Sequence, residues 1–364
     1  MSFDFRFAST DDIDDLVELE RVCFTLDRLN QRNFSWMLSR ANAALIVVTS
    51  GATLCGYALV LFHRGTSLGR LYSIAVSPAW RGHELGQRLL EQAQACALAR
   101  NCAWLRLEVR ADNTAAIRLY EANGYQRFAS VEDYYEDHCE ALRYEKRILR
   151  ETPAPARQVP YYQQTTEFTC GAACLLMAMS AIDPTRAMTR AEEIQLWREA
   201  TTIFMTAGHG GCSPQGLALA AWRRGFDVRL EVSHPGSLFL HGVRSTEKKS
   251  IMKLVEDGFA QELAATQVEQ VLGDYLQIGA ALAAGYKPLV LISSYRFTRL
   301  KAPHWVIITG CDEDFVYLHD PDVDHSKLKR GLDCQHLPVS HQEFLRMTVF
   351  GVQRVRAAVM LRSR

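Results

Sequence analysis

Apolar positions in the first 150 residues follow two patterns, one typical of helices and one typical of strands. From Ile13 to Val22 they recur at helical spacing, behind the N-cap candidates Ser9 and Thr10. Residues 104–109 alternate between apolar and polar, as a half-buried strand does. The same patterns predict strands at 5–7, 43–48, 55–62, 68–76, 125–128 and 142–148, and helices at 34–41, 85–100 and 114–122. This order of elements predicts a domain that mixes helices and strands.

The pattern breaks at residues 151–160, ETPAPARQVP, where three prolines interrupt any regular element. Proline fixes φ and removes a backbone donor, so this stretch predicts an extended linker. A length of 364 residues also favours two domains over one. We therefore expect domains at residues 1–150 and 161–364, joined by the linker 151–160.

The second part of the chain also mixes the two patterns. Residues 172–179 are rich in strong helix formers and contain no breaker, which predicts a helix that begins near Cys170. Further helices are predicted at 189–200, 214–224, 247–264, 268–284 and 342–346, and strands at 226–232, 288–292, 304–309 and 315–319. The predicted fold class of the whole chain is therefore α+β, with two mixed domains.

Composition is that of a globular protein, because 48% of the residues are hydrophobic and 23% are charged. Basic and acidic residues both number 41, and no block of like charge occurs, so we expect no nucleic-acid partner. The N-terminus lacks an apolar signal core, and glycine, lysine and proline interrupt the most apolar stretch, 275–292, so we expect no membrane span. Ten cysteines without a Cys-x-x-Cys pair favour a reducing cytoplasm over a disulfide framework or a zinc ribbon.

Cys170 is the first candidate for chemistry, since it stands at an expected helix N-terminus. The dipole and the free amide N–H groups of such an end favour a thiolate over a thiol. Gln164, six residues upstream, carries an amide that can donate to an anion beside the sulfur. Together the two residues predict a site for nucleophilic acyl transfer.

A thiolate nucleophile needs a base, and the base needs an orienting acceptor. His304 opens an alternating strand, and Asp320 stands at the end of the next one. A hairpin of these two strands brings the two side chains close together. We therefore predict a Cys170–His304–Asp320 triad, and we expect Cys174, one helical turn below Cys170, in the core.

The first domain carries a family resemblance. VSPAWRGHELGQRLLEQA after an apolar strand, followed by LRLEVRADNTAAIRLYEANGY, resembles the GNAT acetyltransferase superfamily over about residues 4–150, and specifically its ribosomal-protein alanine N-acetyltransferase branch. The resemblance implies a GNAT fold and acetyl-CoA as the cofactor. It also implies that Glu108 is the base for an attacking amine and that Tyr120 returns a proton to the leaving thiolate. The residues expected to contact acetyl-CoA are Ile74, Ala75, Val76, Arg81, Gly82, His83, Glu84, Leu85, Gly86, Gln87, Asn113 and Tyr120.

The phosphate loop departs from the family pattern Arg/Gln-x-x-Gly-x-Gly/Ala, because Glu84 replaces its middle glycine. A side chain there occupies a place suited to close backbone approach, and its charge repels a pyrophosphate. Either Glu84 turns outward and acetyl-CoA binding survives in weakened form, or the domain has lost acetyl-CoA. We favour retained binding.

The second domain carries another resemblance, on Cys-Gly-Ala-Ala-Cys, His-Trp-Val and Asp-Pro. Over about residues 159–320 it is similar to the papain-like leader peptidases that are fused to bacteriocin exporters and cut after double-glycine leaders. The resemblance implies a papain-like fold, Cys170 as nucleophile, His304 as base, Asp320 as its orienter, and Gln164 as an oxyanion donor beside the Cys170 amide. We expect no transporter after this domain, and the Cys-to-His gap is longer than in the exporters. The extra residues, about 232–265, are expected to be either a lid or a plain insertion, and the exporters' substrate preference is not carried over.

Two further polar stretches are weaker candidates. Residues 209–212, His-Gly-Gly-Cys, either line a substrate cleft or form a flexible loop. Residues 319–325 look like a metal loop, but His325 stands where a calcium loop needs glycine and Gly331 where it needs glutamate. We expect a polar turn there and no metal.

The sequence thus predicts a bifunctional cytoplasmic enzyme that acts on protein or peptide substrates. One half would acetylate the amine of a protein or peptide N-terminus, or of a small molecule. The other half would attack a carbonyl group, as a cysteine peptidase or amidase does. Two alternatives stay open: a non-catalytic peptide-binding or sensor protein with a degenerate acetyl-CoA site, and a cysteine-dependent acyl transferase in which an amine replaces water.

Overall fold

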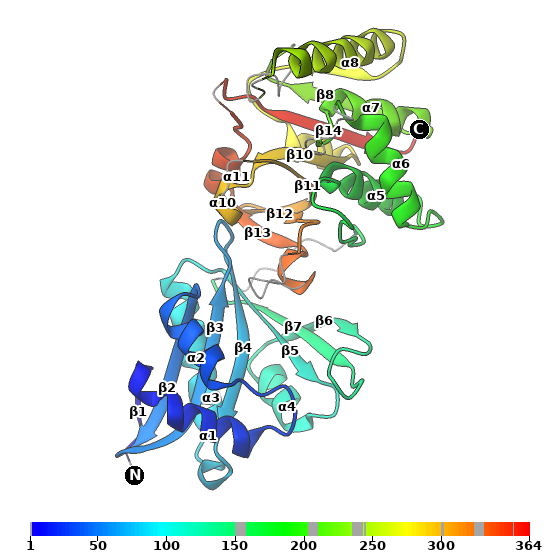
Figure 1. Ribbon diagram of the computed structural model, residues 1–364. Coiled ribbons are helices and arrows are strands. Elements are labelled where there is room, and N and C mark those ends of the chain that lie inside the picture. Colours follow the sequence, from blue (N-terminus) through cyan, green and yellow to red (C-terminus); the bar gives the residue numbers. More distant parts are fainter. Residues whose placement is uncertain are drawn as a thin grey trace. The chain divides into compact units, whose positions relative to one another are not determined.

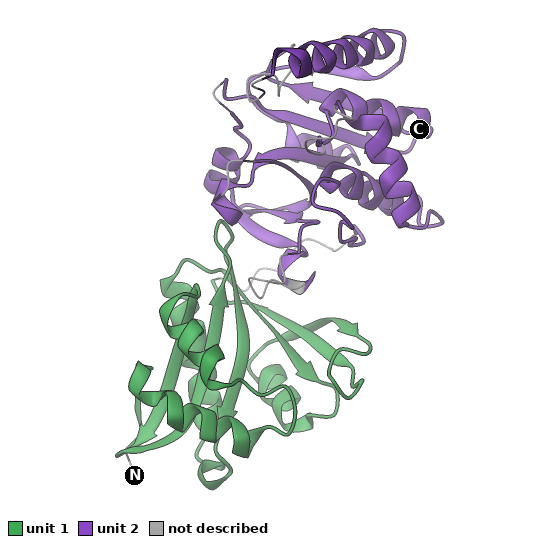
Figure 2. Ribbon diagram, viewed as in Figure 1, with its two compact units in different colours: residues 1–154 green, residues 155–364 purple. Residues whose placement is uncertain are grey.

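The computed structural model describes residues 2–149, 158–202, 210–234, 243, 245–299, 302–323, 331–351 and 353–364. The chain divides into two compact units, residues 1–154 and 155–364 (Figure 2). Most of the predicted linker 151–160, and also His209 and His325, lie outside the described residues. No helix in the described ranges combines the length and the apolar composition that a membrane span requires.

The first unit contains a mixed sheet with helices on both faces (Figure 1). Its elements are β1 (Asp4–Phe7), α1 (Ile13–Cys23), α2 (Gln31–Ser39), β2 (Ala43–Ser50), β3 (Thr53–Phe62), β4 (Leu68–Val76), α3 (Leu85–Ala99), β5 (Trp104–Arg110), α4 (Thr114–Ala122), β6 (Gln126–Val131) and β7 (Ala141–Arg147). The seven strands lie in the order β1-β2-β3-β4-β5-β7-β6, and only β4 and β5 are parallel neighbours.

Successive residues of β3 face opposite layers, because side chains alternate along a strand. Tyr57 meets Phe34 of α2, with ring centroids 5.8 Å apart. Its neighbour Ala58 belongs instead to the cluster that contains Leu89 and Ala93 of α3. The sheet is therefore covered by α1 and α2 on one face and by α3 on the other.

The second unit is built around a second seven-stranded sheet. Its elements are α5 (Cys170–Ile182), α6 (Arg190–Ala200), α7 (Pro214–Arg223), β8 (Asp227–Val232), α8 (Thr246–Ala264), β9 (Glu269–Leu272), α9 (Ile278–Ala283), β10 (Lys287–Ser293), α10 (Tyr295–Thr298), β11 (Pro303–Cys311), β12 (Phe315–His319), β13 (Leu337–Ser340), α11 (His341–Met347) and β14 (Ala357–Arg362). The strand order is β13-β12-β11-β10-β14-β8-β9.

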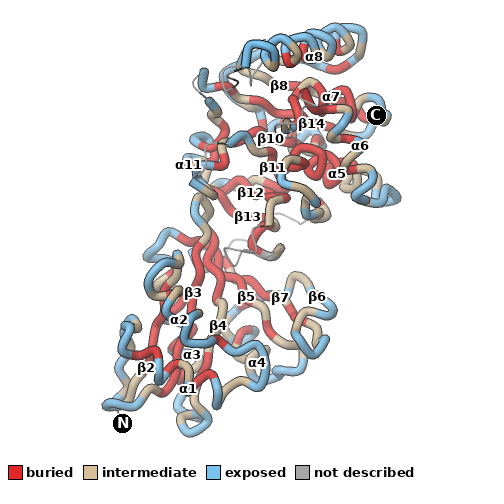
Figure 3. The backbone as a smooth tube through the Cα atoms, in the orientation of Figure 1, coloured by how far each residue is buried: buried red, intermediate tan, exposed pale blue. Residues whose placement is uncertain are grey.

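Helix α5 is the centre of this unit. Every residue from Cys170 to Met179 is buried, and the helix packs on β10, β11 and β14 (Figure 3). A helix that is apolar all round belongs inside a core. Helix α6 packs against α5 and α7, and α7 packs on β8 and β14. The core thus fixes the start of α5, and with it Cys170.

The predicted helix 268–284 is wrong. Residues Glu269–Leu272 form β9, which pairs in parallel with β8, and only Ile278–Ala283 is helical. The break between them lies at Gly273 and Asp274, both poor helix formers. Pairing with the sheet edge overrides the local pattern. In the region between Val232 and Ala265, α8 packs against α7, and residues 235–242 and 244 lie outside the described residues.

Helix α2 begins earlier than the apolar pattern predicts. Asn30 and Asn33 form a reciprocal cap, in which each side chain accepts from the other residue's main-chain N–H, at 3.0 and 2.9 Å. The sequence pattern did not predict the bounds of β13, β14 and the short helix α10.

Candidate active sites

Cys170 is the first residue of α5, and its N-cap is Thr169. The Thr169 side chain does not cap the helix; its hydroxyl donates instead to Glu193, at 2.5 Å. The N-cap side chain therefore leaves the Cys170 amide, at the start of α5, available to an anion. Cys170 is buried, with 7% of its surface exposed.

His304 and Asp320 meet as the hairpin predicts. Strands β11 and β12 pair antiparallel, with Ile307 opposite His319, so the start of β11 adjoins the end of β12. His304 Nε2 lies 2.7 Å from Asp320 Oδ1. The Asp320 side chain is 2% exposed, and the main-chain N–H of Asp322 donates to the same oxygen at 3.0 Å. Asp320 is thereby fixed as a buried acceptor for the imidazole.

The charge on His304 follows from its two neighbours. Burial works against the protonated imidazole, but the negative charges of Asp320 and of the Cys170 sulfur, with hydrogen bonds to both, raise the pKa of His304 to about 10. Because Nε2 faces Asp320, Nδ1 is the nitrogen left for Cys170. The arrangement supports an imidazolium at His304 at neutral pH.

Gln164 lies beside the triad but is directed to Asp322. Its main-chain N–H donates to Pro321 O at 3.0 Å, which ties it to the segment after Asp320. Its Nε2 lies 3.5 Å from Asp322 Oδ1, and its Oε1 is buried without a hydrogen bond to the described residues. A half-turn of the amide would place its N–H₂ group where Oε1 now lies. Gln164 is therefore tied to the segment that follows Asp320, and its role as an oxyanion donor stays a prediction.

The two cysteines next to Cys170 have a different character. Burial raises the pKa of Cys174 and of Cys212, so both thiols stay protonated. Cys174 donates to Trp305 O at 3.4 Å, and Trp305 Nε1 donates to Cys212 O at 3.1 Å. Gly171 packs against Cys212 and Trp305, because an added Cβ would lie 2.9 Å from the Cys212 Cβ and 3.0 Å from Trp305 Cδ1. These residues pack the wall behind Cys170.

Glu193 is a residue of this site that sequence reasoning missed. It lies on α6 and is fully buried, with hydrogen bonds from the segment that precedes Cys170. The sequence shows only one of several acidic residues on a polar helix, so no local signal marks it.

In the first unit, β4 and β5 separate after four paired positions. Leu68 to Leu71 pair with Trp104 to Leu107, while β4 continues to Val76 and β5 to Arg110. Ile74, Ala75 and Val76 therefore lie on a stretch whose backbone groups toward β5 are not paired by that strand. A gap of this kind offers main-chain hydrogen bonds to an extended ligand.

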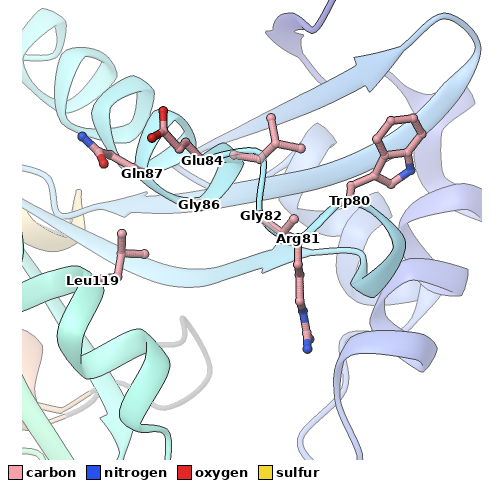
Figure 4. A pocket seen from close by; sticks show the side chains of 9 residues that line it. Trp80, Arg81, Gly82, Glu84, Gly86, Gln87 and Leu119 are labelled. Atoms are coloured by element: carbon pink, nitrogen blue, oxygen red, sulfur yellow. The ribbon is translucent and has the colours of Figure 1, made fainter. Parts of the chain in front are cut away.

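A cavity of about 380 Å³ lies at the N-terminus of α3. It is lined by Val76, Trp80, Arg81, Gly82, Glu84, Leu85, Gly86, Gln87 and Leu119 (Figure 4). Helix α3 has no side-chain cap, so its first amides are available to a phosphate. His83 is directed to Phe3 and Trp80, with ring centroids 5.7 and 6.2 Å apart, and is not part of the lining. Asn113 caps α4 by accepting from the Ala116 N–H at 3.1 Å.

Glu84 is the one acidic residue in this lining. It is the N-cap of α3 and has the left-handed φ of 57° that favours glycine. Its side chain is exposed and lies beside Gln87, while Arg81 projects in the opposite direction (Figure 4). The uncapped α3 amides in this cavity suit a phosphate group, and the charge of Glu84 opposes one.

We expect Glu84→Gly to tighten acetyl-CoA binding by about tenfold, through loss of the repulsion and of a side chain where the backbone must approach the ligand closely. Isothermal titration at low salt measures the change. Glu84→Gln is the matched control: it removes the charge and keeps a side chain at the same φ, and it should give part of the gain. The gain from charge shrinks at high salt. An unchanged dissociation constant in both variants would contradict an effect of Glu84 on the ligand.

Glu108 is held in an ion pair. Arg70 donates to its Oε2, Tyr134 donates to the same oxygen at 2.6 Å, and Arg143 Nε lies 3.5 Å from Oε1. The side chains of Arg70 and Glu108 are 4% and 5% exposed. Glu108 Oε1 has no hydrogen bond to the described residues. The sequence did not predict Arg70 and Arg143 as neighbours of Glu108, because the three residues lie on separate strands, β4, β7 and β5.

Tyr120 lies in the core between the sheet and α4. It is 4% exposed, and its ring centroid lies 5.8 Å from that of Tyr125 and 6.5 Å from that of Tyr144. Burial raises the pKa of Tyr120, so its hydroxyl keeps its proton at neutral pH. The role of Tyr120 as the proton donor to a leaving thiolate stays a prediction.

The chain joins an acetyltransferase-type domain to a cysteine-peptidase-type domain, and comparison with known families supports both parts. Residues 159–362 match the Peptidase_C39 like family, and residues 13–125 match the Acetyltransferase (GNAT) family. The first of these matches covers more than half of the chain, which therefore belongs to the Peptidase_C39 like family. The first unit has the GNAT fold.

The chain is similar to individual acetyltransferases over part of its length. It is 29% identical over 149 residues to a thialysine N-epsilon-acetyltransferase of Bos taurus, covering 40% of this chain and 85% of that protein. It is 28% identical over 135 residues to a putative [ribosomal protein bS18]-alanine N-acetyltransferase of Bacillus subtilis, covering 37% and 88%. A crystal structure of the ribosomal-protein-S18-alanine N-acetyltransferase from Escherichia coli matches 43% of this chain and 99% of that chain, with 23% identity and a TM-score of 0.38.

Proposed function

We propose that the protein is a bifunctional enzyme that acetylates an amine at one site and cleaves or transfers an acyl group at the other. The observation that carries the proposal is the 2.7 Å contact between His304 Nε2 and Asp320 Oδ1, with Cys170 at the start of a buried helix beside the same imidazole. A buried Asp–His pair next to a cysteine at a helix N-terminus has few uses other than nucleophilic catalysis.

The thiol half would work in two steps. The Cys170 sulfur attacks the carbonyl carbon, and the π electrons of the C–O bond move to oxygen, where the Cys170 amide and the Gln164 side chain can donate. The C–N bond breaks, and His304 gives its Nδ1 proton to the leaving nitrogen. A thioester remains on Cys170. Water then attacks the thioester and gives its proton to His304, and the sulfur leaves as thiolate.

An amine can replace water in the second step, which turns hydrolysis into acyl transfer. The Cys–His–Asp geometry serves both reactions equally well. Product analysis with and without an added amine separates them: a new amide is expected for transfer, and only the free acid for hydrolysis.

The acetylating half would use the cavity at α3 and the gap between β4 and β5. Bound acetyl-CoA supplies the acetyl thioester. Glu108 Oε1 takes a proton from the attacking amine, directly or through water, and the Tyr120 hydroxyl gives its proton to the leaving sulfur. The Gly82-to-Gly86 turn and the α3 amides hold phosphate. The acceptor would be the amine of a protein or peptide N-terminus, or of a small molecule.

Glu108→Gln is expected to lower kcat for acetylation by about 10²–10³-fold, because the side chain loses its proton-accepting charge. Arg70→Lys is the matched control for the ion pair, since it keeps the positive charge beside Glu108 and should cost far less. Acetyl transfer to a peptide amine, with the melting temperature recorded in parallel, measures both. A Glu108→Gln variant that is less stable but equally active per folded molecule would contradict the role as base and leave Glu108 as a structural ion-pair partner.

The setting that we propose is the cytoplasm, with protein or peptide substrates and without nucleic-acid or membrane partners. The balanced charge and the ten free cysteines support it. A non-catalytic sensor is the second candidate for the first unit, and Glu84 in the cavity lining is the observation that favours it. Acetyl-CoA binding that is undetectable until Glu84 is replaced by glycine would support that candidate.

A further inference from the structure

Glu193 is a fully buried carboxylate on α6, where Leu196 and Ala200 are also buried. It accepts four hydrogen bonds. Oε1 accepts from the Thr165 N–H at 2.9 Å and from the Thr169 hydroxyl at 2.5 Å. Oε2 accepts from the Tyr162 hydroxyl at 2.9 Å and from the Thr165 hydroxyl at 2.7 Å. Four donors match the acceptor capacity of one ionised carboxylate.

The donors come from one short segment, which ends at the nucleophile. Thr165 follows Gln164, and Thr169 precedes Cys170. Glu193 therefore bonds to Thr165 and Thr169, near the two ends of the segment that runs from Gln164 to Cys170. The Thr169 hydroxyl donates to Glu193 and does not cap α5.

A second residue of α6 supports the same loops one turn further on. Trp197 packs on Phe168, with ring centroids 4.8 Å apart, and its Nε1 donates to Gly210 O at 2.7 Å. Residues four apart lie on the same face of a helix. One face of α6 thus holds the segment before Cys170 and the loop that leads to Cys212.

A buried charge is costly unless its hydrogen bonds are complete, and an apolar side chain would fill the same space without that cost. A carboxylate at this place is explained if the segment must hold one exact conformation. We infer that Glu193 is a positioning residue of the thiol site, which fixes the backbone of the segment that carries Gln164 and the Cys170 amide. This inference rests on the proposed nucleophilic role of Cys170.

The test compares two reactions of the same sulfur. Acylation of Cys170 by p-nitrophenyl acetate passes through an oxyanion, whereas alkylation by iodoacetamide does not. We expect Glu193→Ala to slow acylation by about 10–100-fold and to leave alkylation within about threefold of wild type. Equal slowing of both reactions, or no slowing of acylation in a folded variant, would overturn the inference.

Glu193→Gln is the conservative control. Its amide oxygen can accept from the Thr165 N–H and the Thr169 hydroxyl, while its N–H₂ group donates to the hydroxyls of Tyr162 and Thr165, which can turn to accept. Acylation should recover to within a few-fold of wild type, and a Gln variant as slow as Ala would overturn the inference. If Glu193→Ala does not fold, Thr169→Val removes one of the four bonds and should show the same selective loss on a smaller scale.

A double-mutant cycle identifies the route of the effect. If Glu193 acts through Gln164, Gln164→Ala slows acylation in the wild type and adds little in the Glu193→Ala background. Fully additive losses would contradict that route. The proposed function is tested separately by Cys170→Ala in the same assay: if this variant is acylated at the wild-type rate, the nucleophile assignment fails before the Glu193 variants are considered.

Discussion

Replacing Cys170 by alanine is expected to abolish ester and amide cleavage by the second unit while leaving acetyl transfer by the first unit unchanged. The sulfur forms the covalent intermediate, and no neighbouring group can replace it, since burial keeps Cys174 and Cys212 protonated. Loss of a nucleophile of this kind costs on the order of 10⁴–10⁶ in kcat. Labelling of the native protein by iodoacetamide at neutral pH should also disappear from the peptide that contains residue 170.

Cys174→Ala is the matched control for this experiment. It removes a buried thiol from the same helix, one turn away, and should cost a small amount of stability without loss of labelling or turnover. Labelling and cleavage that persist in Cys170→Ala would contradict the assignment of Cys170 as the nucleophile. Labelling that is lost only in Cys174→Ala would show that Cys174 is the reactive thiol.

Asp320→Asn is expected to have the second largest effect, a fall of about 10³–10⁴-fold in kcat for the thiol reaction. The amide can keep a contact with His304 Nε2 but loses the charge that favours the imidazolium. The alkaline limb of the pH–rate profile, which we expect near pH 10 in the wild type, should therefore move to lower pH in the variant. An unchanged profile would show that Asp320 does not control the protonation of His304.

Asp320→Asn is also expected to change how the unfolding free energy depends on pH. The pKa of His304 is raised from 6.5 to about 10 in the folded protein, so the stabilisation is fully present below about pH 6.5 and is lost as the pH rises through about 10. The difference in unfolding free energy between wild type and Asp320→Asn should shrink over that range. Urea unfolding at several pH values measures this difference in free energy. A difference that grows as the pH rises would contradict the prediction.

Local pattern was enough to predict most of the helices and strands and the α+β class, which the fold and the family comparisons confirm. The hairpin that joins His304 to Asp320 was also readable, because its strands are consecutive and the turn between them is short. Where spacing along the chain fixes spacing in space, sequence reasoning succeeds.

Contacts between distant segments were not readable in the same way. Strand β14 lies in the middle of the second sheet, between β10 and β8, although its six residues carry no signal of that place. The residues of β9 predict a helix, because their local pattern does not show that they pair with β8. Glu193 and the Arg70 partner of Glu108 were missed for the same reason, since each acts on a residue of another element.

The claim that the chain carries two working sites is tested most directly by comparing protein N-termini in cells that express the wild type, Cys170→Ala or Glu108→Gln. Mass spectrometry of N-terminal peptides reads cleavage and acetylation in one experiment. We expect a set of new N-termini that vanishes only in Cys170→Ala, and a set of acetylated N-termini that loses its acetyl group only in Glu108→Gln. N-termini that are identical in all three strains would contradict the account.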